Sequence, residues 1–150
     1  MDKHTYVIGD IHGEAEQLKI LLQKMDLKAE DELYVLGDVV DRGKYPMEAL
    51  QMLMSLPNCT CLAGNHEVMA LSSLKLMLNE ITEDFLNRLS AEQLENLEDW
   101  MRLNGGGTTA LEFTFLSQEK RKEVLEFMEN FALYAELEIN GQSYVLVHGG

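Results

Sequence analysis

Three short runs of glycine and polar residues, each placed just after an apolar stretch, limit the folds open to this chain more than any other feature. Glycine after an apolar run marks a turn, and each turn is followed by apolar residues at helical spacing. We therefore expect three successive strand–turn–helix units. The three runs are Gly9-Asp10-Ile11-His12-Gly13, Gly37-Asp38-Val39-Val40-Asp41-Arg42-Gly43 and Gly64-Asn65-His66-Glu67.

The apolar stretches around these runs predict an α/β fold. We expect strands over 5–8, 33–36 and 59–63. Each is followed by a helix: the first carries a stripe from Leu18 to Met25, the second ends before Pro57, and the third spans about 68–78. Cys59 and Cys61, one residue apart in the third strand, lie on one face of it and are expected to be reduced core thiols.

The polar residues of the three runs are metal ligands by type. The carboxyl ends of neighbouring strands meet at one edge of an α/β sheet, so Asp, His and Asn side chains there lie close together. His148, after another apolar run, adds an imidazole to the same cluster. Such a ligand set suits two divalent cations and predicts metal-assisted hydrolysis of phosphoesters.

The second half of the chain is more helical. We expect a helical insert over about 79–103 with a solvated acidic face and a Ser90/Gln93 capping box. Gly105-Gly106-Gly107 predicts a turn. A further helix over about 118–131, capped by Ser117, precedes strands over 135–139 and 143–147, and Asn140-Gly141 between them predicts a hairpin.

Composition excludes several classes of protein. With 150 residues, 46% of them hydrophobic, the chain fits one domain with a real core. Its net charge of −14 opposes binding to a phosphate backbone, so no nucleic-acid partner is expected. The N-terminus carries no signal-peptide core, and no apolar run is long enough to cross a bilayer, which predicts a cytoplasmic protein without a membrane partner.

The three polar runs, in this order, resemble the metallophosphoesterases of the phosphoprotein phosphatase family, especially its small bacterial and phage members. Asn104-Gly105-Gly106-Gly107 after Trp100, and Val147-His148-Gly149, extend the resemblance over nearly the whole chain. It implies a calcineurin-like metallophosphoesterase fold, a β-sandwich flanked by helices.

The resemblance also implies a ligand set. Asp10 and His12 are expected to bind the first metal, Asp38 to bridge both, and Asn65 and His148 to bind the second. A water between the two ions would be acidified to the attacking hydroxide. Mn²⁺ is the expected metal, with Fe, Zn, Mg and Ni as alternatives.

Three further residues receive catalytic roles from the resemblance. Arg42 is expected to clamp the phosphate, helped by Asn65. His66 is expected to protonate the leaving oxygen, while Asp41 accepts a hydrogen bond from its other ring nitrogen. Glu67 remains open: it either orients Arg42 or His66, or caps the following helix.

The family pattern has one more metal-binding histidine, and usually a substrate arginine, beyond the position of Gly150. The interpretation is that residues 1–150 are the N-terminal portion of a longer catalytic domain. We expect this portion to bind the first metal better than the second and to hydrolyse phosphoesters weakly or not at all.

Three functions remain open from the sequence. The leading one is a serine/threonine protein phosphatase acting on phosphorylated proteins or small phosphoesters. The near alternative is a hydrolase like the bis(5'-nucleosyl)-tetraphosphatases, which shares the metal motifs. An alternative of another class is a non-catalytic binding or regulatory fragment that keeps the fold.

Overall fold

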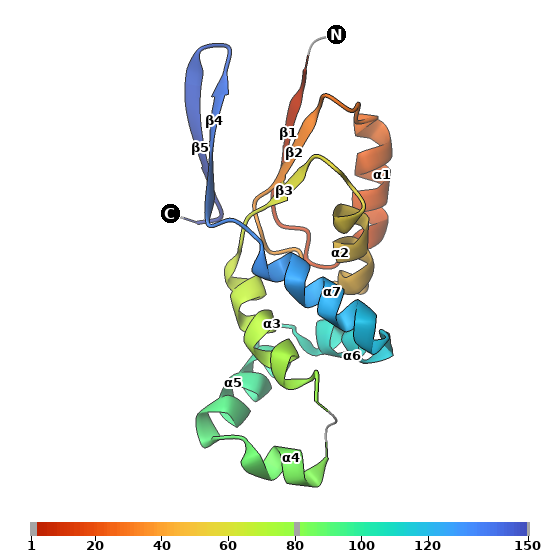
Figure 1. Ribbon diagram of the computed structural model, residues 1–150, viewed down its shortest axis with the longest axis vertical. Helices are drawn as coiled ribbons and strands as arrows, with labels where there is room; N and C mark the ends of the chain where they lie inside the picture. Colours follow the sequence, from red (N-terminus) through yellow and green to blue (C-terminus); the bar gives the residue numbers. More distant parts are fainter. Residues whose placement is uncertain (1–2, 80–81, 150) are drawn as a thin grey trace.

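A parallel sheet of three short strands forms the frame of the molecule (Figure 1). The computed structural model describes residues 3–79 and 82–149. The strands are paired in the order β1-β2-β3, and each is followed by a helix, as the sequence predicts. The elements are β1 (Thr5–Ile8), α1 (Ala15–Met25), β2 (Glu32–Val35), α2 (Pro46–Met54), β3 (Cys59–Cys61) and α3 (Asn65–Leu76).

Apolar side chains of the sheet and helices share one core. In the central strand β2, Leu33 and Val35 point into it and are 1% and 0% exposed. Helices α1 and α2 lie together along one side of the sheet (Figure 1). The largest fully buried side chains include Trp100, Phe113, Leu50, Leu53, Leu62, Leu74 and Met128. The α/β fold class is confirmed, and among the described residues no helix is long and apolar enough to cross a membrane.

The expected helical insert over 79–103 consists of two helices within the described residues. Helices α4 (Glu83–Arg88) and α5 (Ala91–Arg102) are separated by Leu89 and Ser90, whose backbones are extended. Ser90 and Gln93 form the predicted capping box, with bonds of 3.1 and 2.9 Å. The acidic residues within 82–99 are exposed, as expected of a solvated face. Glu80 and Ile81, also assigned to the insert, lie outside the described residues.

Helix α6 (Gly107–Phe115) was not predicted from the sequence, where the three glycines indicated only a turn. Gly105 and Gly106 do form a turn, but Gly107 is the first helical residue. Glycine is a poor helix former, so propensity argues against this start. Packing overrides it, because Thr109, Ala110 and Phe113 on the next turns are buried.

The chain ends in the predicted helix and hairpin. Ser117 caps α7 (Gln118–Glu129) by accepting the N–H of Lys120. Strands β4 (Tyr134–Ile139) and β5 (Gln142–Val147) pair antiparallel. Asn140 and Gly141 both have positive φ, of 53° and 76°, as a tight two-residue hairpin turn requires. The hairpin stands beside the sheet (Figure 1) and returns the end of β5 toward the ends of the parallel strands.

Asp31, just before β2, fixes the entrance to the central strand. It is only 3% exposed, and its two oxygens accept the backbone N–H groups of Lys28 and His4 at 2.9 and 2.8 Å. These bonds, that of Lys28 first, lower the pKa of Asp31 below its ordinary value of 3.8. A depressed pKa in the folded state means that the ionised carboxylate stabilises the fold.

We expect Asp31→Asn to lower the free energy of unfolding near pH 7, because one N–H donor then faces an amide NH₂ group. The stabilisation by Asp31 is complete well above pH 3.8 and is lost as the pH falls through the lower folded-state pKa. The difference between wild type and variant, from urea unfolding, should therefore shrink near pH 3. Glu95→Gln on the exposed face of α5 is the control. A difference that is the same at both pH values would contradict the assignment.

Candidate metal centre

The five side chains expected to bind metal converge at the carboxyl ends of the strands. Asp10 and His12 follow β1, Asp38 follows β2, Asn65 begins α3 after β3, and His148 follows β5. His12 Nε2 lies 3.6 Å from Asp38 Oδ2 and 3.9 Å from Asp10 Oδ2. His148 Nε2 lies 3.4 Å from Asp38 Oδ1 and 3.1 Å from Asn65 Oδ1. The structure thus brings together every ligand named from the sequence.

Asp38 is common to two groups of candidate ligand atoms. One group is Asp38 with His12 and His66, the other is Asp38 with Asp10 and His148, and within each group the atoms lie within 4.8 Å of one another. The shared carboxylate agrees with the expected bridging role. The grouping differs from the expected division, which paired Asp10 with His12 and left His66 outside the ligand set. Which residues share an ion therefore stays a prediction.

Two of the histidines direct Nε2 toward this cluster. The Nδ1 atoms of His12 and His148 lie 3.0 and 2.7 Å from the carbonyl oxygens of Val40 and Leu36. A carbonyl only accepts, so each Nδ1 is assigned as the donor and each Nε2 keeps its lone pair, as in metal-binding histidines. His148 Nε2 and Asn65 Oδ1, 3.1 Å apart, are then two facing acceptors. A cation between the convergent acceptors resolves this conflict, so the donor set fits divalent metals.

His66 and Asp41 form the expected hydrogen-bonded pair. His66 Nδ1 lies 2.8 Å from Asp41 Oδ2, and the two residues are 2% and 0% exposed. Sequence reasoning missed two further partners of Asp41: Trp100 Nε1 donates to Oδ2 at 2.8 Å, and Thr109 Oγ1 donates to Oδ1 at 2.7 Å. The only sequence signal for them was the tryptophan ahead of the glycine run.

Arg42 lies over the same cluster. Its Nη1 donates to His12 Nε2 at 3.3 Å, and the residue is exposed at the mouth of the site. Its backbone N–H donates to the carbonyl of Gly105 at 2.9 Å. A planar guanidinium held at the edge of convergent acceptors is placed to meet an incoming phosphate, which agrees with the clamp role.

Glu67 ties two site loops together, which answers the question that the sequence left open. Its Oε2 accepts the N–H groups of Asp38 and Gly64 at 2.8 and 2.9 Å, and its Oε1 accepts those of Val39 and Val40 at 2.7 and 3.3 Å. The bond to Gly64 caps α3, so this helix begins at Asn65 rather than near Val68. Burial raises the pKa of Glu67 above its ordinary value, although the backbone N–H groups act in the opposite direction.

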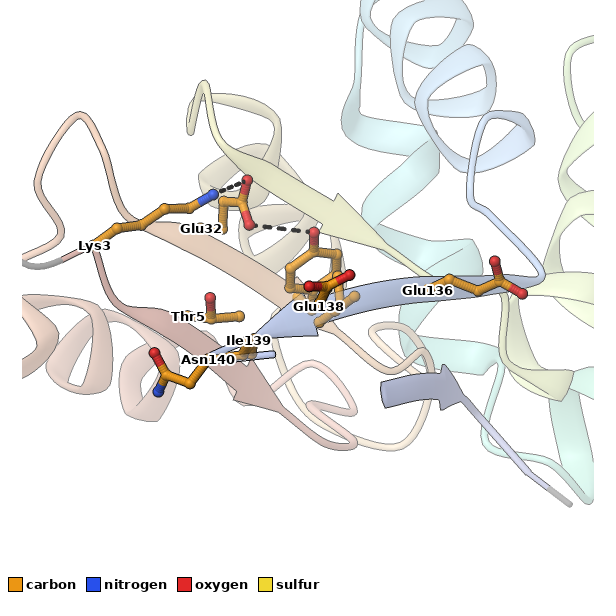
Figure 2. A pocket seen from close by; sticks show the side chains of 9 residues that line it. Lys3, Thr5, Glu32, Glu136, Glu138, Ile139 and Asn140 are labelled. Atoms are coloured by element: carbon orange, nitrogen blue, oxygen red, sulfur yellow. Dashed lines mark hydrogen bonds and ion pairs between the residues drawn. The ribbon is translucent and has the colours of Figure 1, made fainter. Parts of the chain in front are cut away.

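A groove on the described surface lies away from this cluster. A space of about 430 Å³ opens between β1, β2 and β4, with Lys3, Glu32, Glu136 and Glu138 along its walls (Figure 2). Lys3 Nζ contacts Glu32 at 2.8 Å within it. None of the proposed metal ligands lines this groove. The chemistry is therefore assigned to the strand ends, where the candidate ligand atoms converge, and not to this groove.

The chain belongs to the calcineurin-like phosphoesterase family, whose sequence profile matches residues 3–150. The fold and the convergent ligands at the strand ends agree with this membership. The narrower resemblance to phosphoprotein phosphatases stays a prediction.

Two curated relatives carry the same name, symmetrical bis(5'-nucleosyl)-tetraphosphatase. The protein of Erwinia tasmaniensis is 37% identical over 101 residues, which are 65% of this chain and 37% of that protein. The protein of Shewanella loihica is 39% identical over 104 residues, 66% of this chain and 37% of that protein. The chain thus spans little more than a third of the length of these relatives.

A solved structure shares the fold at low sequence identity. The crystal structure of a metallophosphoesterase from Sphaerobacter thermophilus superimposes with a TM-score of 0.52 and 18% identity. The match covers 87% of this chain and 41% of that one. At this identity the similarity shows the fold alone.

We expect Glu67→Gln to destabilise the chain by about 2 kcal/mol, because an amide NH₂ would replace a buried acceptor facing backbone N–H groups. The free energy of unfolding should be measured without added metal, so that loss of bound ions does not contribute. Glu129→Gln, which breaks only an exposed ion pair with Lys75, is the matched control and should change little. Equal stability of the Glu67 and Glu129 variants would show that the loops do not depend on this carboxylate.

Proposed function

We propose that this chain carries the catalytic centre of a metal-dependent phosphoester hydrolase. Asp10, His12, Asp38, Asn65 and His148 are the proposed ligands of two divalent cations, with Mn²⁺ as the first ion to test. The observation that carries the proposal is the buried carboxylate of Asp38, shared by two groups of ligand atoms. A carboxylate between two cations is the arrangement found in two-metal hydrolases.

The bound cations and the side chains of Arg42 and His66 would have different roles in hydrolysis of the ester. Bound divalent cations would stabilise the charge on the phosphate oxygens and make the attacking water more acidic. Arg42, at the mouth of the site, binds two phosphate oxygens with its planar fork. His66, oriented by Asp41, gives its proton to the leaving oxygen.

The proposed substrate is a dinucleoside tetraphosphate, the alternative weighed in the sequence. The curated relatives, which are named as symmetrical bis(5'-nucleosyl)-tetraphosphatases, support this choice over a protein phosphatase. A serine/threonine protein phosphatase is the second candidate, because Asp41-Arg42 and Asn65-His66-Glu67 resemble that family. A non-catalytic fragment remains the alternative of another class.

We expect Asp38→Asn to lower Mn²⁺-dependent hydrolysis of 4-nitrophenyl phosphate more than about 100-fold, since loss of an outer-sphere partner alone costs 10–100-fold. Bound metal should also fall below the wild-type stoichiometry, because the shared ligand loses its charge. Asp26→Asn, an exposed position at the end of α1, is the control. An inactive wild type that binds about one ion would support the non-catalytic alternative instead.

The substrate class is tested by comparing diadenosine tetraphosphate with a phosphoserine peptide under the same metal conditions. We expect kcat/KM to be at least about tenfold higher for the dinucleotide, because specificity is the ratio of these values. Product analysis by anion-exchange chromatography identifies which phosphate bond is cut. Faster release of phosphate from the peptide would favour the protein phosphatase.

A further inference from the structure

We propose that Trp100 and Thr109 are positioning residues that hold Asp41, and through it His66, in the orientation for protonating the leaving oxygen. The inference rests on the proposed function, and it assigns a role to the corner between α5 and α6. Neither residue touches the proposed metal ligands through a hydrogen bond among the described residues.

The Asp41 carboxylate is fixed from three directions. Oδ2 accepts from both His66 Nδ1 and Trp100 Nε1, each at 2.8 Å, while Oδ1 accepts from Thr109 Oγ1 at 2.7 Å. The Thr109 hydroxyl in turn accepts the Asp41 backbone N–H at 2.9 Å. All four residues are at most 2% exposed, so water does not replace a lost partner readily. The carboxylate therefore cannot turn away from His66 without leaving a buried donor unpaired.

The backbone beneath this carboxylate also needs outside support. Asp41 and Arg42 are consecutive non-glycine residues in the left-handed region, with φ of 70° and 67°. Such residues are rare and persist where the surroundings hold them. The N–H of Arg42 is bound by the carbonyl of Gly105, and the N–H of Asp41 by Thr109. The α5–α6 corner thus holds both the proton-donor pair and the phosphate clamp.

The corner is built around the Trp100 indole. Gly106 packs so closely that a Cβ there would lie 2.2 Å from the ring. The Gly106 N–H donates to the Trp100 carbonyl at 2.9 Å, and the Gly106 carbonyl accepts from Ala110 at 2.8 Å. The indole N–H is therefore aimed at Asp41 by a rigid turn rather than by a free side chain.

In the proposed step, the oxygen of a water molecule bonds to phosphorus as the bridging P–O bond breaks, and the released phosphate keeps the protons of that water. The imidazolium of His66 transfers its Nε2 proton to the bridging ester oxygen. The electron pair of the broken P–O bond stays on the oxygen, which leaves as an alcohol, and the imidazole becomes neutral while its Nδ1–H remains bonded to Asp41. A phenolate or alkoxide leaving group needs this proton, whereas nitrophenolate is a weak base and needs it less. A misplaced His66 should therefore lower the hydrolysis rate mainly for esters whose leaving group is a strong base.

The kinetic test compares phenyl phosphate with 4-nitrophenyl phosphate in Trp100→Phe and Thr109→Val. We expect kcat for phenyl phosphate to fall about tenfold or more, kcat for 4-nitrophenyl phosphate to fall less than about twofold, and KM to stay the same. Thr109→Ser, which keeps the hydroxyl, should restore the wild-type ratio. Thr108→Val is the matched control, because the Thr108 hydroxyl is buried and has no hydrogen-bond partner within the described part of the chain.

A second readout does not depend on activity. In the NMR spectrum of the wild-type chain with Mg²⁺, the His66 Nδ1–H proton should be protected from exchange with water. It should exchange rapidly in Trp100→Phe and Thr109→Val, but not in Thr108→Val or Thr109→Ser.

The outcomes separate this inference from the proposed function. Equal losses on both substrates, or a protected Nδ1–H in Thr109→Val, would overturn the positioning role and leave the hydrolase proposal intact. A wild type that hydrolyses neither substrate would overturn the proposed function, and the exchange measurement would still decide whether Trp100 and Thr109 position the pair.

Discussion

The buried carboxylate of Glu67 is the interaction on which the site depends. It binds the N–H of Gly64, before α3, and three consecutive N–H groups of the loop after β2. The carbonyl of Asp38 in that loop accepts the N–H groups of Ile11 and His12, which follow β1. The Glu67 carboxylate and the Asp38 carbonyl together therefore join the ends of the three parallel strands. Unpaired, these buried N–H groups would each cost free energy.

Four of the six non-glycine residues with positive φ in the described part of the chain lie in these loops. His12, Asp38, Asp41 and Arg42 all have positive φ, between 45° and 70°. Left-handed conformations of such residues cluster at functional sites, where surrounding bonds hold them in place. Here those bonds come from Glu67, from the carbonyl of Gly105 and from the hydroxyl of Thr109. Ligand placement in this family member is thus a property of the packed loops and not of any strand alone.

Family membership and the geometry of the site agree on the chemistry. The candidate ligand atoms converge where two βα turns, the start of α3 and the end of a hairpin meet, and Asp38 is common to both candidate groups. The matched relatives narrow the proposal toward dinucleoside tetraphosphates, while most of the length of those proteins lies outside the matched region. The acidic charge of the chain is compatible with the proposal, because bound cations and Arg42 would reverse the sign of the charge at the site itself.

Much of the fold was predictable because its signals are local. Apolar periodicity located the three strand–helix units, the Ser90/Gln93 pair located the start of α5, and Asn140-Gly141 located the hairpin. Helix α6 was not predictable, since its start at Gly107 contradicts propensity and depends on the buried packing of Thr109 and Phe113. The helix start at Ser90 also implied the break between α4 and α5, because a capping box marks the first turn of a helix.

The sequence by itself determined the chemical types of the site residues and their places after apolar strands. Both the residue types and their positions follow from side-chain identity and local turn propensity, which can be recognised in the sequence alone. Only the tertiary structure decided that Glu67 joins the loops, that Trp100 and Thr109 hold Asp41, and that His12 and His148 present Nε2 rather than Nδ1. The physical reason is that, apart from the local bond between Gly64 and Glu67, these bonds join groups 27 to 112 residues apart in the sequence. Their partners are chosen by packing and by the need to pair every buried polar group.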